Sequence, residues 1–291
     1  MRNFDYFAPR SLEEACALLA RYGEEARVLA GGTDLLVQMK QGLLEPKYMI
    51  NIKAIPGLNR IQYSQKEGLR LGSLVIHHEL MSNPIIQEKF SILAQAASQI
   101  GGVQTRNLGT IGGNIAHGSP SADTAPPLLL LGAKVKIVGH KKSRTIPIED
   151  FFLGPGQTAL QRDEVLTEIR VPTLAPGTTA VYLKLGQRRA LDIAIVGVAA
   201  LITLAGRDSL CQDIKLALGA VAPTPIRAKR AEEMLRGKLI TETLLEQASQ
   251  VAAEEAQPIS DLRSSAEYRL EMVKVLVKRA IEQALEGARK A

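Results

Sequence analysis

Two short segments, each with a pair of adjacent glycines, constrain most strongly what this chain can fold into. The first is VLAGGTDL from Val28 to Leu35, and the second is GTIGGNIA from Gly109 to Ala116. Glycine is needed where the main chain takes a positive φ or where a Cβ atom would collide with a neighbour. A run of such residues can expose several backbone N–H groups, and converging amides hold anionic oxygens. The pattern predicts two loops that approach a ligand closely, and a phosphate group is the ligand that such amides suit best.

A single Gly-Gly pair is as readily explained by a simple turn. Here Thr33, Asp34, Thr110 and Asn114 add hydroxyl, carboxylate and amide groups beside the glycines, which favours a binding site. Neither segment has the three spaced glycines of a Rossmann dinucleotide-binding fold or the Lys-Ser/Thr ending of a P-loop. A Rossmann NAD domain and a P-loop NTPase are therefore disfavoured.

Three motifs, by their order and separation, resemble the FAD-binding (medium) subunit of molybdenum hydroxylases, the family of xanthine dehydrogenase and carbon monoxide dehydrogenase. They are AGGTDL at Ala30–Leu35, TIGGN at Thr110–Asn114 and SPSAD at Ser119–Asp123. The resemblance extends over the whole chain. It implies an α+β fold: a two-subdomain FAD-binding domain of the vanillyl-alcohol-oxidase-like type, then a C-terminal flavoprotein domain.

Two prolines and a glycine between Pro172 and Thr179 mark the best candidate for a domain boundary. We expect the FAD-binding domain at residues 1–175, with subdomains of roughly 1–55 and 56–175, and the C-terminal domain at 176–291. The three strands and three helices predicted after the boundary indicate a three-stranded antiparallel sheet with a helix bundle.

Local patterns predict individual elements before the boundary. Ser11 and Glu14 form a capping box that predicts a helix over 12–22. Asn83-Pro84 predicts a second helix start, with the helix continuing to about Ile100. Turn formers dominate from Gln104 to Pro127 and predict a long, ordered but irregular stretch. The predicted strands are 27–30, 48–52, 69–71, 133–138, 144–148, 165–171, 180–185, 193–205 and 214–220, and the remaining helices are 226–236, 241–256 and 265–288.

The resemblance implies the residues that contact FAD. Residues 29–34 match the loop that wraps the FAD diphosphate, and Thr110, Gly113 and Asn114 match a second loop near the diphosphate or flavin. The complete set of implied cofactor-binding residues is Leu29, Ala30, Gly31, Gly32, Thr33, Asp34, Ile100, Thr110, Gly113, Asn114, Ala116, Asp123, Leu166 and Lys184.

Four of these residues have particular implied roles. Asp123 matches a carboxylate that binds the ribose of the adenosine half, with a helix N-cap as the structural alternative. Leu166 and Lys184 match positions that pack on the isoalloxazine ring and approach its polar edge, although an exposed strand lysine is the alternative for Lys184. Ile100 matches a position that packs on the adenine and is often aromatic in relatives.

Composition narrows the chemistry further. The chain has two cysteines and four histidines, which are scattered apart from the adjacent pair His77-His78, and this disfavours an iron–sulfur cluster or a structural zinc site on this chain. The net charge of +6 is spread among mixed signs without a basic block, so nucleic-acid binding is not expected. There is no apolar run of about 18 residues and no signal-peptide pattern, which predicts a cytoplasmic protein without a membrane span.

No catalytic triad, carboxylate pair or metal-ligand motif is evident, so we expect no catalytic side chain and give His117 no proton-transfer role. The resemblance implies an FAD electron-transfer subunit, which accepts electrons from 2Fe-2S clusters on a small subunit. A large molybdopterin subunit oxidises the substrate, and the expected assembly is a dimer of heterotrimers. The alternatives are a self-contained FAD oxidoreductase and a non-catalytic nucleotide-binding scaffold protein.

Overall fold

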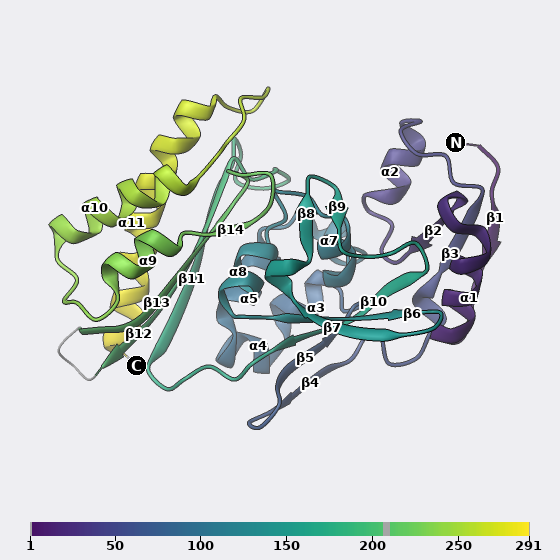
Figure 1. Cartoon of the computed structure of the whole chain (residues 1–291), viewed down its shortest axis with the longest axis horizontal. Helices are drawn as coiled ribbons and strands as arrows, with labels where there is room; N and C mark the ends of the chain where they lie inside the picture. The colour runs from purple at the N-terminus through teal and green to yellow at the C-terminus, as the bar shows by residue number, and fades with distance from the viewer. Residues whose placement is uncertain (1, 206–209, 291) are drawn as a thin grey trace.

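The computed structural model describes residues 2–205 and 210–290, which form three larger β-sheets and one two-stranded ribbon, with helices packed between and around them (Figure 1). A small sheet built from the first 51 residues lies at one side of the molecule. A five-stranded sheet occupies the middle, and a four-stranded sheet lies beyond it near the C-terminus. This mixture of segregated sheets and helices confirms the predicted α+β class.

The first sheet consists of three short parallel strands, β1 (Asp5–Phe7), β3 (Tyr48–Asn51) and β2 (Ala26–Leu29), in that order. Helix α1 (Leu12–Tyr22) packs against it and confirms the helix predicted over 12–22. The Ser11 hydroxyl accepts a hydrogen bond from the Glu14 N–H at 3.1 Å. Strand β2 leads directly into the first glycine segment, after which helix α2 (Leu35–Lys40) begins. The sheet therefore presents the glycine segment at the end of a strand.

The second sheet has five antiparallel strands with the latest one in sequence at its centre. Their order is β4 (Ile61–Ser64), β5 (Gly68–Gly72), β10 (Glu164–Val171), β6 (Lys134–Gly139) and β7 (Ser143–Pro147). The hairpin of β6 and β7 was predicted and is confirmed. Strand β10 shifts register between Leu166 and Glu168, which is a β-bulge beside the site described below.

Six short helices lie between the sheets: α3 (His77–Ser82), α4 (Pro84–Lys89), α5 (Ser91–Ser98), α6 (Val103–Arg106), α7 (Ile111–Ala116) and α8 (Ala125–Leu130). The single helix predicted from Pro84 to about Ile100 is wrong, because the chain leaves helical geometry at Phe90, whose φ is −138°. Its side chain is buried, so tertiary packing overrides local helix preference there. The irregular stretch predicted over 104–127 instead contains α7 and parts of α6 and α8.

The third sheet contains the three predicted antiparallel strands, β11 (Thr178–Leu185), β12 (Val196–Ala205) and β13 (Leu210–Gly219). A two-residue strand, β14 (Ile226–Arg227), adds a fourth strand at the start of the segment predicted as helix, so α9 (Lys229–Leu235) begins later. Helices α10 (Glu242–Glu255) and α11 (Ala266–Lys290) complete the C-terminal layer. Strands β8 (Phe152–Gly154) and β9 (Gln157–Thr158) form a separate ribbon.

The third sheet is covered on both faces. Helices α9 and α11 pack on one face, while α5 and α8 from the N-terminal half pack on the other (Figure 1). One apolar core accordingly joins residues of both halves, such as Leu93 and Leu128 with Tyr182 and Leu201. Among the described residues, no helix combines the length and the apolarity that crossing a membrane requires.

Candidate functional site

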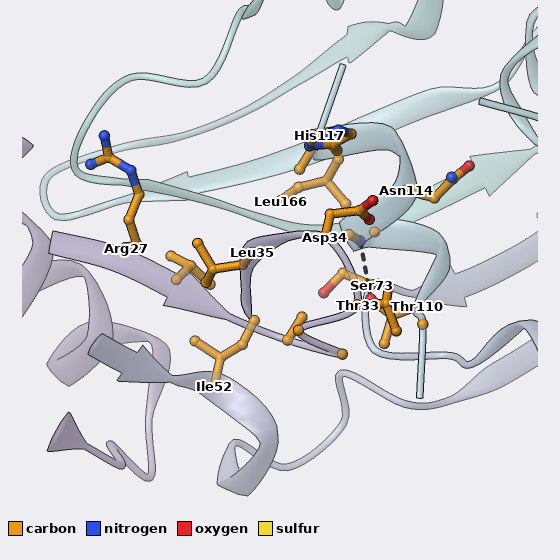
Figure 2. A pocket seen from close by; sticks show the side chains of 18 of the residues that line it. Arg27, Thr33, Asp34, Leu35, Ile52, Ser73, Thr110, Asn114, His117 and Leu166 are labelled. Atoms are coloured by element: carbon orange, nitrogen blue, oxygen red, sulfur yellow. Dashed lines mark hydrogen bonds between the residues drawn. The ribbon is translucent and has the colours of Figure 1, made fainter. Parts of the chain in front are cut away.

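A cavity of about 570 Å³ lies where the two glycine segments meet strand β10 (Figure 2). Its walls come from the end of β2, the turn before α3, helix α7 and the bulged part of β10. Eleven of the fourteen residues implied by the resemblance line it: Ala30, Gly31, Gly32, Thr33, Asp34, Ile100, Thr110, Gly113, Asn114, Ala116 and Leu166. Residues far apart in sequence thus meet around one space.

The first glycine segment presents free backbone amides to this cavity. Within the described part of the chain, the N–H groups of residues 31–34 donate to no protein group. Gly32 has φ of +74°, which favours glycine. A Cβ on Gly31 would lie 2.2 Å from the carbonyl oxygen of Leu108, so its missing side chain lets the two segments touch. This segment has the open amides expected of an anion cradle.

The second segment differs, because the protein itself uses its amides. Thr110 caps α7, and its Oγ1 accepts from the Gly113 N–H at 3.0 Å. The N–H groups of Ile111 and Gly112 donate to the carbonyl oxygens of Val75 and Ser73 at 2.9 Å. The expectation that both segments expose a run of amides is therefore wrong for the second one. Its glycines serve close packing, and its polar side chains are what it offers to a ligand.

Asn114 is the clearest of those side chains. The buried hydroxyl of Thr124 donates to Asn114 Oδ1 at 2.6 Å. This bond leaves the Nδ2 amino group as the free end of the Asn114 side chain. In Figure 2, Asn114 extends from α7, on the same part of the chain as Thr110 and His117. The pair of Thr124 and Asn114 therefore holds a donor in a fixed orientation.

An apolar wall completes the cavity. Leu166 from β10 and Ile100 after α5 are both buried and line it together with Ala116. The β-bulge after Leu166 turns this part of the strand relative to its neighbours. A ligand held here would have an anionic part near the open amides and flat, apolar parts against Leu166 and Ile100.

Three implied residues do not line the cavity. Leu29 is buried beside Met39 and Met49. The Asp123 carboxylate accepts from Lys184 Nζ and from the Tyr182 hydroxyl, both at 2.8 Å. Burial raises the pKa of Asp123, and the contacts with Lys184 and Tyr182 offset part of that rise. The N-cap alternative for Asp123 is not observed, because Thr124 occupies the N-cap position of α8. Lys184 is equally buried, which rules out the exposed-lysine alternative.

Two lining residues, Ser73 and His77, were not singled out by the sequence as part of this site. His77 drew attention only as part of a His-His pair. Burial, with a smaller contribution from Arg106, lowers the pKa of His77 to about 4, so the imidazole is neutral at pH 7. Their signal in the sequence is weak, because it depends on β5 and α7 lying together. Among the described residues, no cluster of three metal-ligating side chains is present.

The geometry fits a dinucleotide cofactor such as FAD. Open amides at residues 31–34 suit a diphosphate, and the missing Cβ of Gly31 lets the backbone approach it. The polar groups of Thr110 and Asn114 and the apolar surface of Leu166 suit the remaining parts of such a molecule.

Two family models match the chain. The model described as the FAD binding domain in molybdopterin dehydrogenase matches residues 2–174. The model described as the CO dehydrogenase flavoprotein C-terminal domain matches residues 181–284.

Individual relatives match nearly the full length. The carbon monoxide dehydrogenase medium chain of Hydrogenophaga pseudoflava is 38% identical, covering 97% of each chain. A xanthine dehydrogenase FAD-binding subunit of Escherichia coli is 34% identical over 97% of this chain and 96% of its own. The solved carbon monoxide dehydrogenase of Hydrogenophaga pseudoflava, in a form lacking the Mo-pyranopterin moiety, superimposes with a TM-score of 0.94 over 99% of this chain and 98% of its own.

Proposed function

Since the chain belongs to the family of FAD-binding medium subunits of molybdenum hydroxylases, we propose that its cavity holds FAD between the two glycine segments. The chain is the FAD-binding electron-transfer part of an oxidoreductase. Bound FAD supplies the chemistry, by accepting electrons from iron–sulfur clusters and passing them to an external acceptor. The protein residues bind and orient the cofactor.

The single observation that carries this assignment is the row of unused amides at residues 31–34 opposite the apolar wall of Leu166. The amides hold the diphosphate, and Asn114 donates through Nδ2 to an adjacent oxygen. Leu166 and Ile100 exclude water from the flat rings. We keep Asp123 as a proposed contact to the ribose, because each carboxylate oxygen can accept more than one hydrogen bond. Lys184 also stays a proposed contact to the flavin edge, but its three N–H groups already donate to Asp123, Gln99 and Asp192, so that contact would have to replace one of these bonds. Leu29 acts only through its backbone beside Ala30.

We further propose a division of labour along the chain and among subunits. Residues 1–175 bind FAD, and residues 176–291 form the C-terminal flavoprotein domain. A large subunit with molybdopterin and a small subunit with two 2Fe-2S clusters join this chain in a dimer of heterotrimers. Relatives named medium chains of dehydrogenases support the multi-subunit part of this proposal. We expect the complex in the cytoplasm, where the reducing environment keeps thiols such as those of Cys16 and Cys211 free.

The test is an absorption spectrum of the purified chain, followed by heat release and chromatography that separates FAD from FMN. We expect released FAD and no iron absorption. A chain that stays colourless after incubation with FAD would contradict the proposal and favour the nucleotide-binding scaffold. Turnover of a substrate by the isolated chain would instead favour a self-contained FAD oxidoreductase. The mass of the complex purified with its partners then tests the dimer of heterotrimers.

A further inference from the structure

The segment that joins β5 to α3 forms a third wall of the cavity, outside both glycine segments. Ser73 follows the last residue of β5, and His77 is the first residue of α3. Their exposed fractions are 3% and 2%, yet both side chains line the cavity. In Figure 2, Ser73 lies with Thr33 and Thr110, one from each glycine segment.

Backbone hydrogen bonds fix this segment against the second glycine segment. The His77 N–H donates to the Gly109 carbonyl oxygen at 3.0 Å. In the opposite direction, the Gly112 N–H donates to the Ser73 carbonyl oxygen at 2.9 Å. A Cβ on Gly109 would lie 3.2 Å from His77 Cδ2 and 3.4 Å from Thr33 Oγ1, which places the imidazole close to both glycine segments. The two side chains are therefore held in place before any ligand arrives.

Each of the two side chains has a polar atom that the protein does not use. Ser73 Oγ and His77 Nδ1 are buried without a hydrogen-bond partner. Such atoms are uncommon in folded proteins, because an unpaired buried polar group destabilises the native state. Four side-chain atoms of this kind exist among the described residues, and the other two belong to arginines that do not line the cavity. Both residues line the cavity, so the two unsatisfied atoms lie in its wall, where a bound ligand would supply the missing partners.

We propose that Ser73 Oγ and His77 Nδ1 donate hydrogen bonds to oxygen atoms around the diphosphate of FAD, as a third group of contacts beside the two glycine segments. This inference rests on the proposed function of the cavity. The low pKa of His77 keeps its imidazole neutral, so that one ring nitrogen carries a hydrogen and can donate a hydrogen bond. The open amides at residues 31–34 and these two donors then face the same anionic part of the cofactor from different elements.

The test compares variants of the full chain after removal of flavin. Ser73→Ala removes one unsatisfied atom, so the flavin-free variant should melt at a higher temperature than the wild type while its Kd for FAD rises about tenfold. His77→Leu should also raise the Kd about tenfold. His77→Asn, whose amide replaces Nδ1 in position, should keep most of the affinity. His78→Leu, on the exposed side of the same helix, is the matched control and should bind FAD like the wild type.

Phosphorus NMR of bound FAD gives a second measurement, in which Ser73→Ala and His77→Leu should shift the diphosphate resonances. A wild-type chain that binds FAD, with both variants within twofold of its Kd, would overturn this inference and leave the proposed function intact. A wild-type chain that takes up no FAD would overturn both. Ser73→Ala decides the matter if His77→Leu does not fold, because it deletes a single oxygen atom.

Discussion

At the scale of single residues, Gly31 is the position where the two glycine segments depend most on a missing side chain. A Cβ there would lie within 3 Å of three backbone atoms, which cannot rotate away: Leu108 O, Leu108 C and Gly109 Cα. Gly31→Ala should destabilise the chain by about 1–3 kcal/mol and abolish FAD retention, since the segments must separate. Flavin content and melting temperature measure both effects.

Gly154→Ala is the control for this substitution, because the nearest atom to its Cβ would be 3.6 Å away. Gly113→Ala should have a smaller effect than Gly31→Ala, because only Thr110 Oγ1, at 2.9 Å, opposes its Cβ. Equal flavin loss in all three variants would show that the contact between the segments is not what the glycines provide.

Thr124 is a positioning residue whose effect should appear only through Asn114. Thr124→Val keeps the shape of the side chain but removes the hydroxyl that donates to Asn114 Oδ1. The amide then loses its fixed orientation, and FAD binding should weaken by about 1 kcal/mol, or roughly fivefold in Kd. Thr124→Ser keeps the hydroxyl and should bind FAD nearly as the wild type does. Wild-type affinity in Thr124→Val would remove Thr124 from the site.

At the scale of elements, the sequence predicted best those features that depend on neighbouring residues. Helix α1 begins after Ser11 and ends at Tyr22 as expected, since capping is a local interaction. The β6–β7 hairpin is local too. Strand β1 was missed, because it is short and its partner β3 is distant in sequence. Strand β4 was missed although its partner β5 is its neighbour in sequence, because its four residues carry too short a pattern to predict a strand.

The same distinction applies to the cavity. The glycine segments were predicted because several of their residues stand together in sequence. Ser73 was missed because its role depends on β5 lying beside α7, a pairing that no local pattern encodes. The amides of Ile111 and Gly112 are used by that same neighbouring segment, so the second glycine segment could not be distinguished from the first by sequence alone.

Helix α11 depends on one buried side chain in its first turn. Arg269 donates to the carbonyl oxygens of Ile195 and Ala220 at 2.8 and 3.0 Å, and to Asp261 at 2.8 Å. Arg269→Met would leave two carbonyls unpaired, and the free energy of unfolding should fall by about 2–4 kcal/mol. Arg279→Met, exposed on the same helix, should change it by less than about 0.5 kcal/mol. Urea unfolding checks both values, and equal losses would contradict the anchoring role.

At the scale of the whole molecule, the two halves of the chain share an ion pair as well as a core. Asp123 precedes α8, while Lys184 and Tyr182 belong to β11. The Asp123 and Lys184 side chains are 8% and 7% exposed, and Lys184 Nζ also donates to the carbonyl oxygens of Gln99 and Asp192. The cluster therefore joins the N-terminal half to the third sheet. It does so at Gln99, the residue before Ile100, which lines the cavity.

Breaking this buried pair should destabilise the molecule independently of FAD. Lys184→Met leaves the Asp123 carboxylate buried without its cation, which should lower the free energy of unfolding by about 3–5 kcal/mol. The double variant Lys184→Met with Asp123→Leu should regain much of the lost stability, because no unpaired charge is then buried. The pKa of Asp123, already raised by burial, should rise further in Lys184→Met. A raised folded-state pKa gives stability that is present below the unfolded pKa and lost as pH rises, so this variant should lose less at about pH 5 than at about pH 8. Urea unfolding of the flavin-free chain measures this, and single variants that change FAD affinity alone would instead assign the pair to the ligand.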